Sequence, residues 1–401
     1  MKIVIVAGTR PNFMKVAPIF RAIDSFNKKD RCHDSSSSKA KEKLKKLTKK
    51  GIVPILVHTG QHYDHNMSQT FFNDLGIRSP DYNLEVGSGS HAEQTAKIMV
   101  EFEKVCLQVK PDYVLVVGDV NSTIAAGLVA KKLNLRLIHV EAGLRSGDKS
   151  MPEEINRLAT DSITDIFFTT EPDGTANLLK EGHSKGQIFF VGHVMIDNLF
   201  YQLNKVQKGY VSEHCKRLKK QLPVKYICMT LHRPSNVDNK EILEKILLTV
   251  NNLSKEYELP VIFSCHPRTK RQIKFFKLDK YVINASLESN TCKIVTGIYL
   301  LNPLCYNDFL YLWKDCLLVL TDSGGLQEET TALKVPCVTL RENTERPITC
   351  QIGSNTLIGN DPDKLKSVIK EILSGNVRNS RIPDLWDGKA SKRIIDILIF
   401  L

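Results

Sequence analysis

The sequence predicts an α/β protein built from two doubly wound, Rossmann-like domains that face a central cleft. Apolar runs rich in β-branched residues alternate with helical patterns along the chain. Most of these runs are apolar throughout, as in parallel strands that helices cover on both faces. The alternation occurs in two series, separated by a polar, lysine-rich break at residues 202–223. With 401 residues, the chain is long enough for two domains with a core each.

The strands of the first series are predicted at residues 2–6, 52–58, 113–117, 135–140, 166–169 and 188–191. Those of the second series are predicted at residues 226–230, 260–264, 294–301, 317–321 and 336–340. We therefore expect an N-terminal domain at residues 1–195, a second domain at 196–380 and a C-terminal segment at 381–401. Ligands of such sheets bind beyond the carboxyl ends of the strands, which predicts a site in the cleft between the domains.

Composition and charge exclude several classes of function. The net charge is +12, but residues 27–51 supply +7 of it, with ten Lys/Arg against three Asp/Glu. This basic insertion reads as a Ser-rich surface loop that runs into a short helix, without the interleaved aromatic residues that stack on bases. We expect no nucleic-acid partner. No apolar run reaches the length of about 18 residues that predicts a membrane helix. Ten scattered cysteines without a Cys-x-x-Cys pair indicate reduced thiols and a cytoplasmic protein.

The most informative motif is Ser323-Gly324-Gly325, between an apolar strand pattern and a helical run. Unpaired N–H groups at a helix N-terminus carry partial positive charge, and glycines let a phosphate approach them closely. Glu329, about one turn into the helix, is placed to accept a hydrogen bond from a ribose hydroxyl. The motif therefore predicts a nucleotide diphosphate site, although a tight turn without a ligand fits the motif alone equally well.

Further polar residues follow other predicted strands. They are Arg10, Lys15, Asp119, Glu141 and Glu153 in the first half, and His232 and His266 in the second. A single acid after a strand is commonly a helix cap, and a single histidine is usually structural. Together, however, they lie on the predicted ligand side, and neighbouring carboxylates suit acid/base chemistry. The residues thus indicate an enzyme whose second domain binds a nucleotide diphosphate and whose first domain acts on the group it carries.

Two other chemistries are disfavoured. His58, His62 and His65 have a metal-like spacing, but the segment leaves a strand and crosses a glycine turn, so the three rings need not share a face. Ser323 is not in a Gly-x-Ser-x-Gly nucleophile elbow. We expect neither a metal nor another cofactor.

In these motifs the chain resembles the non-hydrolysing UDP-N-acetylglucosamine 2-epimerases. The matching segments occur in the family's order and span nearly the whole chain. They are Gly8-Thr9-Arg10-Pro11 with Lys15, Gly60-Gln61-His62, Gly118-Asp119, residues 139–145, residues 152–157, His232-Arg233, residues 321–329 and Thr344-Glu345-Arg346-Pro347.

The resemblance implies a GT-B-like fold whose C-terminal helix, near residues 390–401, returns to the first domain. It implies reversible conversion of UDP-GlcNAc to UDP-ManNAc, through elimination of UDP to 2-acetamidoglucal and its re-addition. The family needs no nicotinamide or metal, commonly forms homodimers and acts in polysaccharide biosynthesis. A UDP-sugar and a second copy of the chain are thus the expected partners.

The resemblance also implies roles for individual residues. Asp119, Glu141 and Glu153 would share the removal and return of the C2 proton, and Lys15 and Arg10 would support the diphosphate or these carboxylates. His232 would stabilise the departing UDP. In the second domain, Ser323, Gly324 and Gly325 would hold phosphate, Glu329 the ribose, and His266 the nucleotide side.

The chain departs from the family pattern at three places. Residues 61–64 retain only part of a segment with which some bacterial members bind a second, activating UDP-GlcNAc. His193 replaces a usual Asn, and the basic insertion is longer than the family's helix. A hydrolysing 2-epimerase, a 2-epimerase for a modified UDP-sugar, a GT-B glycosyltransferase and a binding protein on a catalytically dead fold remain alternatives.

Overall fold

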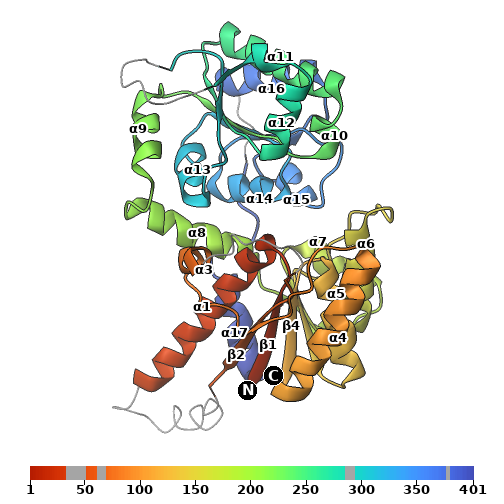
Figure 1. The fold of residues 1–401 in the computed structure, drawn as a ribbon. Helices are drawn as coiled ribbons and strands as arrows, with labels where there is room; N and C mark the ends of the chain where they lie inside the picture. Colours follow the sequence, from red (N-terminus) through yellow and green to blue (C-terminus); the bar gives the residue numbers. More distant parts are fainter. Residues whose placement is uncertain (33–50, 61–68, 285–293, 376–379) are drawn as a thin grey trace. The chain divides into compact units, whose positions relative to one another are not determined.

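The computed structural model describes residues 1–32, 51–60, 69–284, 294–375 and 380–401 (Figure 1). The chain divides into two compact units. Unit 1 comprises residues 1–198 and 384–401, and unit 2 comprises residues 199–383. Each unit contains one parallel seven-stranded sheet with flanking helices, which confirms the predicted fold class of two α/β Rossmann-like domains.

In unit 1 the strands have the order β3-β2-β1-β4-β5-β6-β7, and every pairing is parallel. The order reverses direction at β1, so β1 and β4 flank the topological switch point where such sheets bind ligands. The strands are β1 (Lys2–Ala7), β2 (Val53–His58), β3 (Tyr82–Asn83), β4 (Tyr113–Val117), β5 (Arg136–Val140), β6 (Ile166–Thr169) and β7 (Ile188–Phe190).

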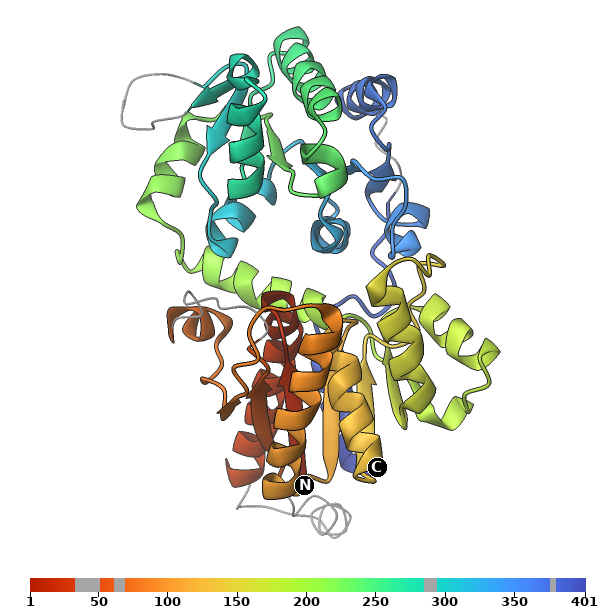
Figure 2. The same cartoon turned by 45° about the vertical axis from the view of Figure 1, so that its right-hand side comes forward.

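Helices cover both faces of this sheet, which explains its apolar strands. Its helices are α1 (Arg10–Cys32), α3 (Gln69–Leu75), α4 (His91–Val109), α5 (Asn121–Lys132), α6 (Pro152–Ile163), α7 (Pro172–Lys180), η1 (Lys185–Gln187) and α17 (Ala390–Phe400). Ile3 and Ile5 of β1 pack with α1 and α17, whereas Val4 and Val6 pack with α4 and α5. Figures 1 and 2 show α17 beside α1, on the opposite side of the sheet from α4.

The C-terminal helix α17 is anchored in unit 1 by polar and apolar contacts. The Asp197 carboxylate accepts hydrogen bonds from the first backbone N–H groups of the helix, at Ala390 (3.0 Å) and Ser391 (2.7 Å). The Trp386 indole donates to the Thr170 carbonyl oxygen at 3.1 Å. Ile394, Ile395 and Leu398 then complete the core beneath α1. The last residues of the chain thus fold as part of the first unit.

Unit 2 repeats the architecture with strand order β10-β11-β9-β8-β12-β13-β14, again entirely parallel. The switch point lies between β8 and β12. The strands are β8 (Ile227–Thr230), β9 (Val261–Ser264), β10 (Val282–Asn284), β11 (Ile298–Leu301), β12 (Leu318–Thr321), β13 (Cys337–Thr339) and β14 (Asn355–Leu357).

Helix α8 (Val194–Gln207) runs from unit 1 into unit 2. The other helices of unit 2 are α9 (Glu213–Gln221), α10 (Pro234–Val237), α11 (Lys240–Glu256), α12 (Pro267–Phe275), η2 (Asp279–Tyr281), α13 (Tyr306–Trp313), α14 (Gly324–Leu333), α15 (Pro347–Gln351) and α16 (Pro362–Leu373). Leu243 and Leu247 of α11, with Leu365 and Ile369 of α16, pack against the strands in one core.

The structure differs from the sequence prediction mainly at the edges of the sheets. The edge strands β3, β10 and β14 have two or three residues each, and one of these is an Asn, so none forms a recognisable apolar run. The strand predicted at 294–301 begins only at Ile298, because the turn at Gly297, where φ is +102°, precedes it. Most of the basic insertion lies outside the described residues. Within the described ranges, no helix has the length and apolarity needed to cross a membrane.

Candidate functional site

In unit 1 the predicted residues Lys15 and Glu141 form an ion pair. Lys15 lies in the first turns of α1, after β1, and Glu141 directly follows β5. Both surround Gly118, at the end of β4: a Cβ built on this glycine would lie 3.0 Å from Lys15 Nζ and 3.5 Å from Glu141 Oε2. Glu141 is 6% exposed and has a φ of +74°, a backbone strain that often marks functional positions. Three strand ends thus meet around one acid.

Asp119 is held by a second basic residue. Arg157 Nη2 lies 2.7 Å from Asp119 Oδ2, and the Arg157 Nε–H donates to the same oxygen at 2.9 Å. Arg157 also pairs with Glu154. Burial alone would raise the pKa of Glu154, but N–H groups of Ser146 and Gly147 and the Arg157 guanidinium hold it below its usual range. The buried Arg157 therefore joins two carboxylates at the start of α6.

The remaining predicted residues of unit 1 are more open. Glu153, in the first turn of α6, and Arg10, the first residue of α1, are both exposed. In unit 1 the structure thus brings together Lys15 with Glu141, and Asp119 with Arg157, while it does not place Glu153 or Arg10 in these two pairs. His58 is buried at the end of β2, and burial lowers its pKa. His62 and His65, the other members of the metal-like spacing, lie outside the described residues.

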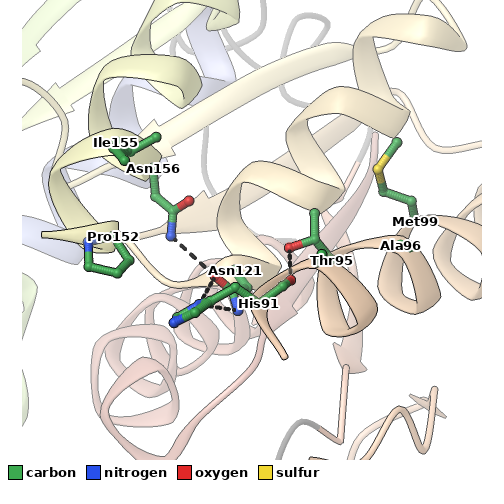
Figure 3. A pocket seen from close by; sticks show the side chains of 9 residues that line it. His91, Thr95, Ala96, Met99, Asn121, Pro152, Ile155 and Asn156 are labelled. Carbon is green, nitrogen blue, oxygen red and sulfur yellow. Dashed lines mark hydrogen bonds between the residues drawn. The ribbon is translucent and has the colours of Figure 1, made fainter. Parts of the chain in front are cut away.

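A pocket of about 420 Å³ opens beside Asp119, lined by the first turns of α4, α5 and α6 (Figure 3). Its polar side is formed by His91, Asn121 and Asn156. His91 Nδ1 lies 3.1–3.2 Å from the Asn121 side-chain amide, and the Asn156 amide donates to the Asp119 carbonyl oxygen at 2.9 Å. Figure 3 shows Asn156 pointing toward Asn121. The pocket residue Asn156 is therefore hydrogen-bonded to the backbone of the candidate catalytic acid Asp119.

In unit 2 the predicted His232 follows β8 and contacts Asp322, which follows β12. His232 Nδ1 lies 2.8 Å from Asp322 Oδ1, and the carboxylate also accepts the backbone N–H groups of His232 and Arg233. Burial would raise the pKa of Asp322, but these hydrogen bonds and the His232 ring hold it below its ordinary value. The His232 side chain is 43% exposed, so a buried carboxylate orients a histidine that solvent or a ligand can reach.

Helix α14 begins at Gly324, and Ser323 is its N-cap, so Ser-Gly-Gly lies at a strand–helix junction as predicted. Gly325 faces open space. The Arg341 guanidinium and the Glu345 carboxylate lie beside Gly324. Arg341 Nη2 pairs with Glu345 at 2.8 Å, but its buried Nη1 has no hydrogen-bond acceptor among the described residues. Because buried donors are nearly always paired, this orphaned donor beside a helix N-terminus suits an anionic ligand.

Glu329 is buried within α14 and accepts a hydrogen bond from the Tyr306 hydroxyl at 2.5 Å. Burial raises the pKa of Glu329 to about 8, and the neighbouring Glu328 adds to the rise, while the Tyr306 hydrogen bond opposes it. His266 is exposed at the N-cap of α12, with its ring 6.3 Å from that of His232. In unit 2 the structure therefore brings His232 near His266, and separately pairs Glu329 with Tyr306.

A family model described as UDP-N-acetylglucosamine 2-epimerase matches residues 45–399. The chain belongs to this family. A UDP-N-acetylglucosamine 2-epimerase of Methanococcus maripaludis is 42% identical over 398 residues, 99% of this chain and 98% of the relative.

Two further proteins similar to this epimerase-family chain have names that state their own sugar substrates. A UDP-2,3-diacetamido-2,3-dideoxy-D-glucuronate 2-epimerase of Pseudomonas aeruginosa is 34% identical, with 99% of both chains covered. The crystal structure of Methanocaldococcus jannaschii UDP-GlcNAc 2-epimerase in complex with UDP-GlcNAc and UDP has a TM-score of 0.79. It is 40% identical, and both chains are covered completely.

The sequence did not predict a role for four residues of the site. Asp322 and Arg157 lie inside the motifs named above but had no predicted role, and Tyr306 and Arg341 lie outside those motifs. Arg157 is three residues after its partner Glu154 on a helix, a spacing that indicates a shared face. Tyr306 and Arg341 carry no local signal, because only the tertiary fold brings them to α14.

Proposed function

We propose that this protein interconverts UDP-GlcNAc and UDP-ManNAc by eliminating UDP to 2-acetamidoglucal and adding it back. The observation that carries the proposal is the placement of Lys15, Glu141 and Asp119 around the Gly118 turn. A C2 proton is weakly acidic, so its removal needs a fixed carboxylate at hydrogen-bond distance. The unit 1 cluster supplies fixed carboxylates, and the family at 42% identity supplies the substrate class.

In the first step a carboxylate of unit 1 takes the C2 proton. The electron pair of the broken C–H bond forms the C1–C2 double bond, and the C1–O bond breaks so that its electrons leave with UDP. Glu141 is our preferred base, because Lys15 fixes its carboxylate and a strained backbone aims it. Asp119 and Glu153 would handle the proton on the opposite face of C2.

Unit 2 would hold the departing UDP. The orphaned Arg341 donor and the N-terminus of α14, at Ser323, Gly324 and Gly325, suit its phosphates. His232, oriented by Asp322, would stabilise the negative charge that develops on the diphosphate. The ribose would contact Glu329, and His266 and Arg10 would add charge or hydrogen bonds. Proton return to the other face of C2, with re-addition of UDP at C1, gives the inverted sugar.

Product analysis separates this proposal from its alternatives. The purified protein is incubated with UDP-GlcNAc, and the products are resolved by chromatography and NMR. UDP-ManNAc at equilibrium with UDP-GlcNAc supports the proposal, whereas free ManNAc plus UDP identifies a hydrolysing enzyme. An unchanged UDP-GlcNAc would overturn the proposal. In that case, turnover of the diacetamido uronic acid analogue would indicate the modified-sugar activity that the Pseudomonas relative's name describes.

A further inference from the structure

A buried network of hydrogen-bonded polar groups lies beneath the Gly118 turn in unit 1. His139, on β5, is 0% exposed, and its two ring nitrogens face two oxygens. Nδ1 lies 2.7 Å from Asp161 Oδ1, and Nε2 lies 2.9 Å from the Gly118 carbonyl oxygen. Asp161, on α6, is also completely buried. None of these contacts involves a residue with a predicted catalytic role.

The partners determine where the ring hydrogens are. A carbonyl oxygen only accepts, so Nε2 carries a hydrogen that it donates to Gly118. Asp161 Oδ2 accepts the Gly143 N–H at 3.0 Å and lies 2.8 Å from Arg145 Nη2. Burial alone would raise the pKa of Asp161, but His139 and Arg145 hold it below its ordinary value. The contact with the Asp161 carboxylate at Nδ1 and the hydrogen bond to Gly118 at Nε2 therefore fix the ring from both sides.

Charged groups around His139 extend this hydrogen-bond network to the surface of unit 1. Arg145 donates from Nε and Nη2 to the Glu181 carboxylate at 2.8 and 2.6 Å. Asp161 thus lies between His139 and the Arg145 guanidinium, and Glu181 balances the charge of Arg145. Because His139 and Asp161 are completely buried, Arg145 is largely buried and all three are hydrogen-bonded, this part of the network is stiff, and any change at His139 leaves a buried acceptor unpaired.

The Gly118 carbonyl is the point where this network meets the candidate acids. Gly118 has a φ of +67°, and its N–H donates to the Val140 carbonyl oxygen at 3.1 Å. The peptide that joins Gly118 to Asp119 is therefore fixed by His139 on one side. On the other side, the Asn156 amide binds the Asp119 carbonyl oxygen. The same turn carries Lys15 and Glu141 beside it.

We propose that His139 is a positioning residue for the epimerisation, which orients Asp119 and the Gly118 turn through its Nε2–H hydrogen bond. The inference rests on the proposed function, since it assigns a role within that same site. His139 does not touch the substrate; it acts through the backbone that carries Asp119. Displacing a catalytic group by about 1 Å can cost about 10²-fold in rate, so losing this hydrogen bond should lower turnover and spare binding.

The kinetic test compares His139→Asn with His183→Asn, a matched change outside the network, where the His183 ring packs on Phe167. Asparagine places its amide near the Nδ1 position and cannot reach the Gly118 oxygen. We expect kcat for UDP-GlcNAc to fall about 10²-fold in His139→Asn, with KM and UDP affinity within about twofold. A kcat within about threefold of wild type, or a loss confined to KM, would overturn the inference. Failure of the wild-type protein to epimerise would instead overturn the proposed function.

A second measurement needs no variant. NMR of the intact protein with ¹⁵N-labelled histidine should show one histidine whose Nε2–H exchanges slowly with solvent, because the buried Gly118 carbonyl oxygen accepts that hydrogen. If no histidine has a protected Nε2 hydrogen, the hydrogen-bond arrangement inferred for His139 is wrong.

Discussion

The two units place carboxylates in contrasting environments. In unit 1, Glu141 is paired with Lys15 and Asp119 with Arg157, so these two candidate acids each have a cation beside them, while Glu153 is exposed. In unit 2, the buried Glu329 accepts a hydrogen bond from a tyrosine hydroxyl and has another acid as neighbour, and its pKa rises to about 8. Lys15 and Arg157 stabilise the negative charge of the carboxylates that are proposed to remove a proton. Glu329, which its raised pKa keeps neutral, lies where the ribose of the ligand is expected to supply hydrogen-bond donors.

This contrast shows how two domains of the same fold can take different parts of one reaction. Both units place their polar residues at the carboxyl ends of parallel strands. Unit 1 fixes its carboxylates with basic side chains, which suits proton transfer. Unit 2 offers a helix N-terminus, an orphaned arginine donor and an oriented histidine, which suit a leaving diphosphate.

The largest effect should come from Glu141→Gln. The amide removes the negative charge that pairs with Lys15 but keeps the side-chain shape, so we expect turnover to fall about 10²- to 10⁴-fold with the fold intact. Asp119→Asn and Glu153→Gln should also lower the rate severely. UDP affinity, measured by calorimetry, should be unchanged because unit 2 is untouched. Near-wild-type turnover in all three variants would break the assignment of proton transfer to unit 1.

The next largest effect is expected for His232→Asn in unit 2. Removal of a donor that stabilises developing negative charge typically costs about 10² to 10³-fold in kcat. Stopped-assay kinetics should show that loss, while the circular dichroism spectrum stays that of wild type. If kcat is retained and only KM rises, His232 contributes to binding and not to departure of UDP.

A smaller effect, on stability, should distinguish the environment of Glu329 in unit 2 from that of the ion-paired acids in unit 1. The folded-state pKa of Glu329, about 8, exceeds its ordinary value of 4.5, so stability from the neutral form is complete below about pH 4.5 and is lost as the pH rises through 8. Glu329→Gln stays neutral, and we expect it to exceed wild type by about 1–3 kcal/mol at pH 9 but not at pH 5. Thermal unfolding of both proteins at the two pH values checks this, and equal differences would contradict the raised pKa.

The smallest effect is expected from chelation. Asp119 and Glu141 already bind basic side chains, so we expect activity to be unchanged after incubation with EDTA and dialysis. Complete loss of activity that added zinc restores would revive the histidine site at His58, His62 and His65.

The sequence predicted the architecture well because buried parallel strands are long apolar runs. The same reasoning did not predict β3, β10 and β14, where two or three residues that include an Asn do not form an apolar run. The Ser-Gly-Gly junction was predictable from local order alone. The partners of the predicted residues were not: Tyr306 reaches Glu329 from another helix, and His139 meets Gly118 only because β4 and β5 pair in the sheet. Side-chain pairs across strands depend on register, which a single sequence does not specify.

The most direct test of the account is proton NMR of UDP-GlcNAc with the purified protein in D₂O. Removal and return of the C2 proton through a carboxylate in exchange with solvent should place deuterium at C2 of both UDP-GlcNAc and UDP-ManNAc as they approach equilibrium. Epimerisation that retains the original proton, or a sugar that never exchanges despite bound UDP, would contradict proton transfer by the acids of unit 1.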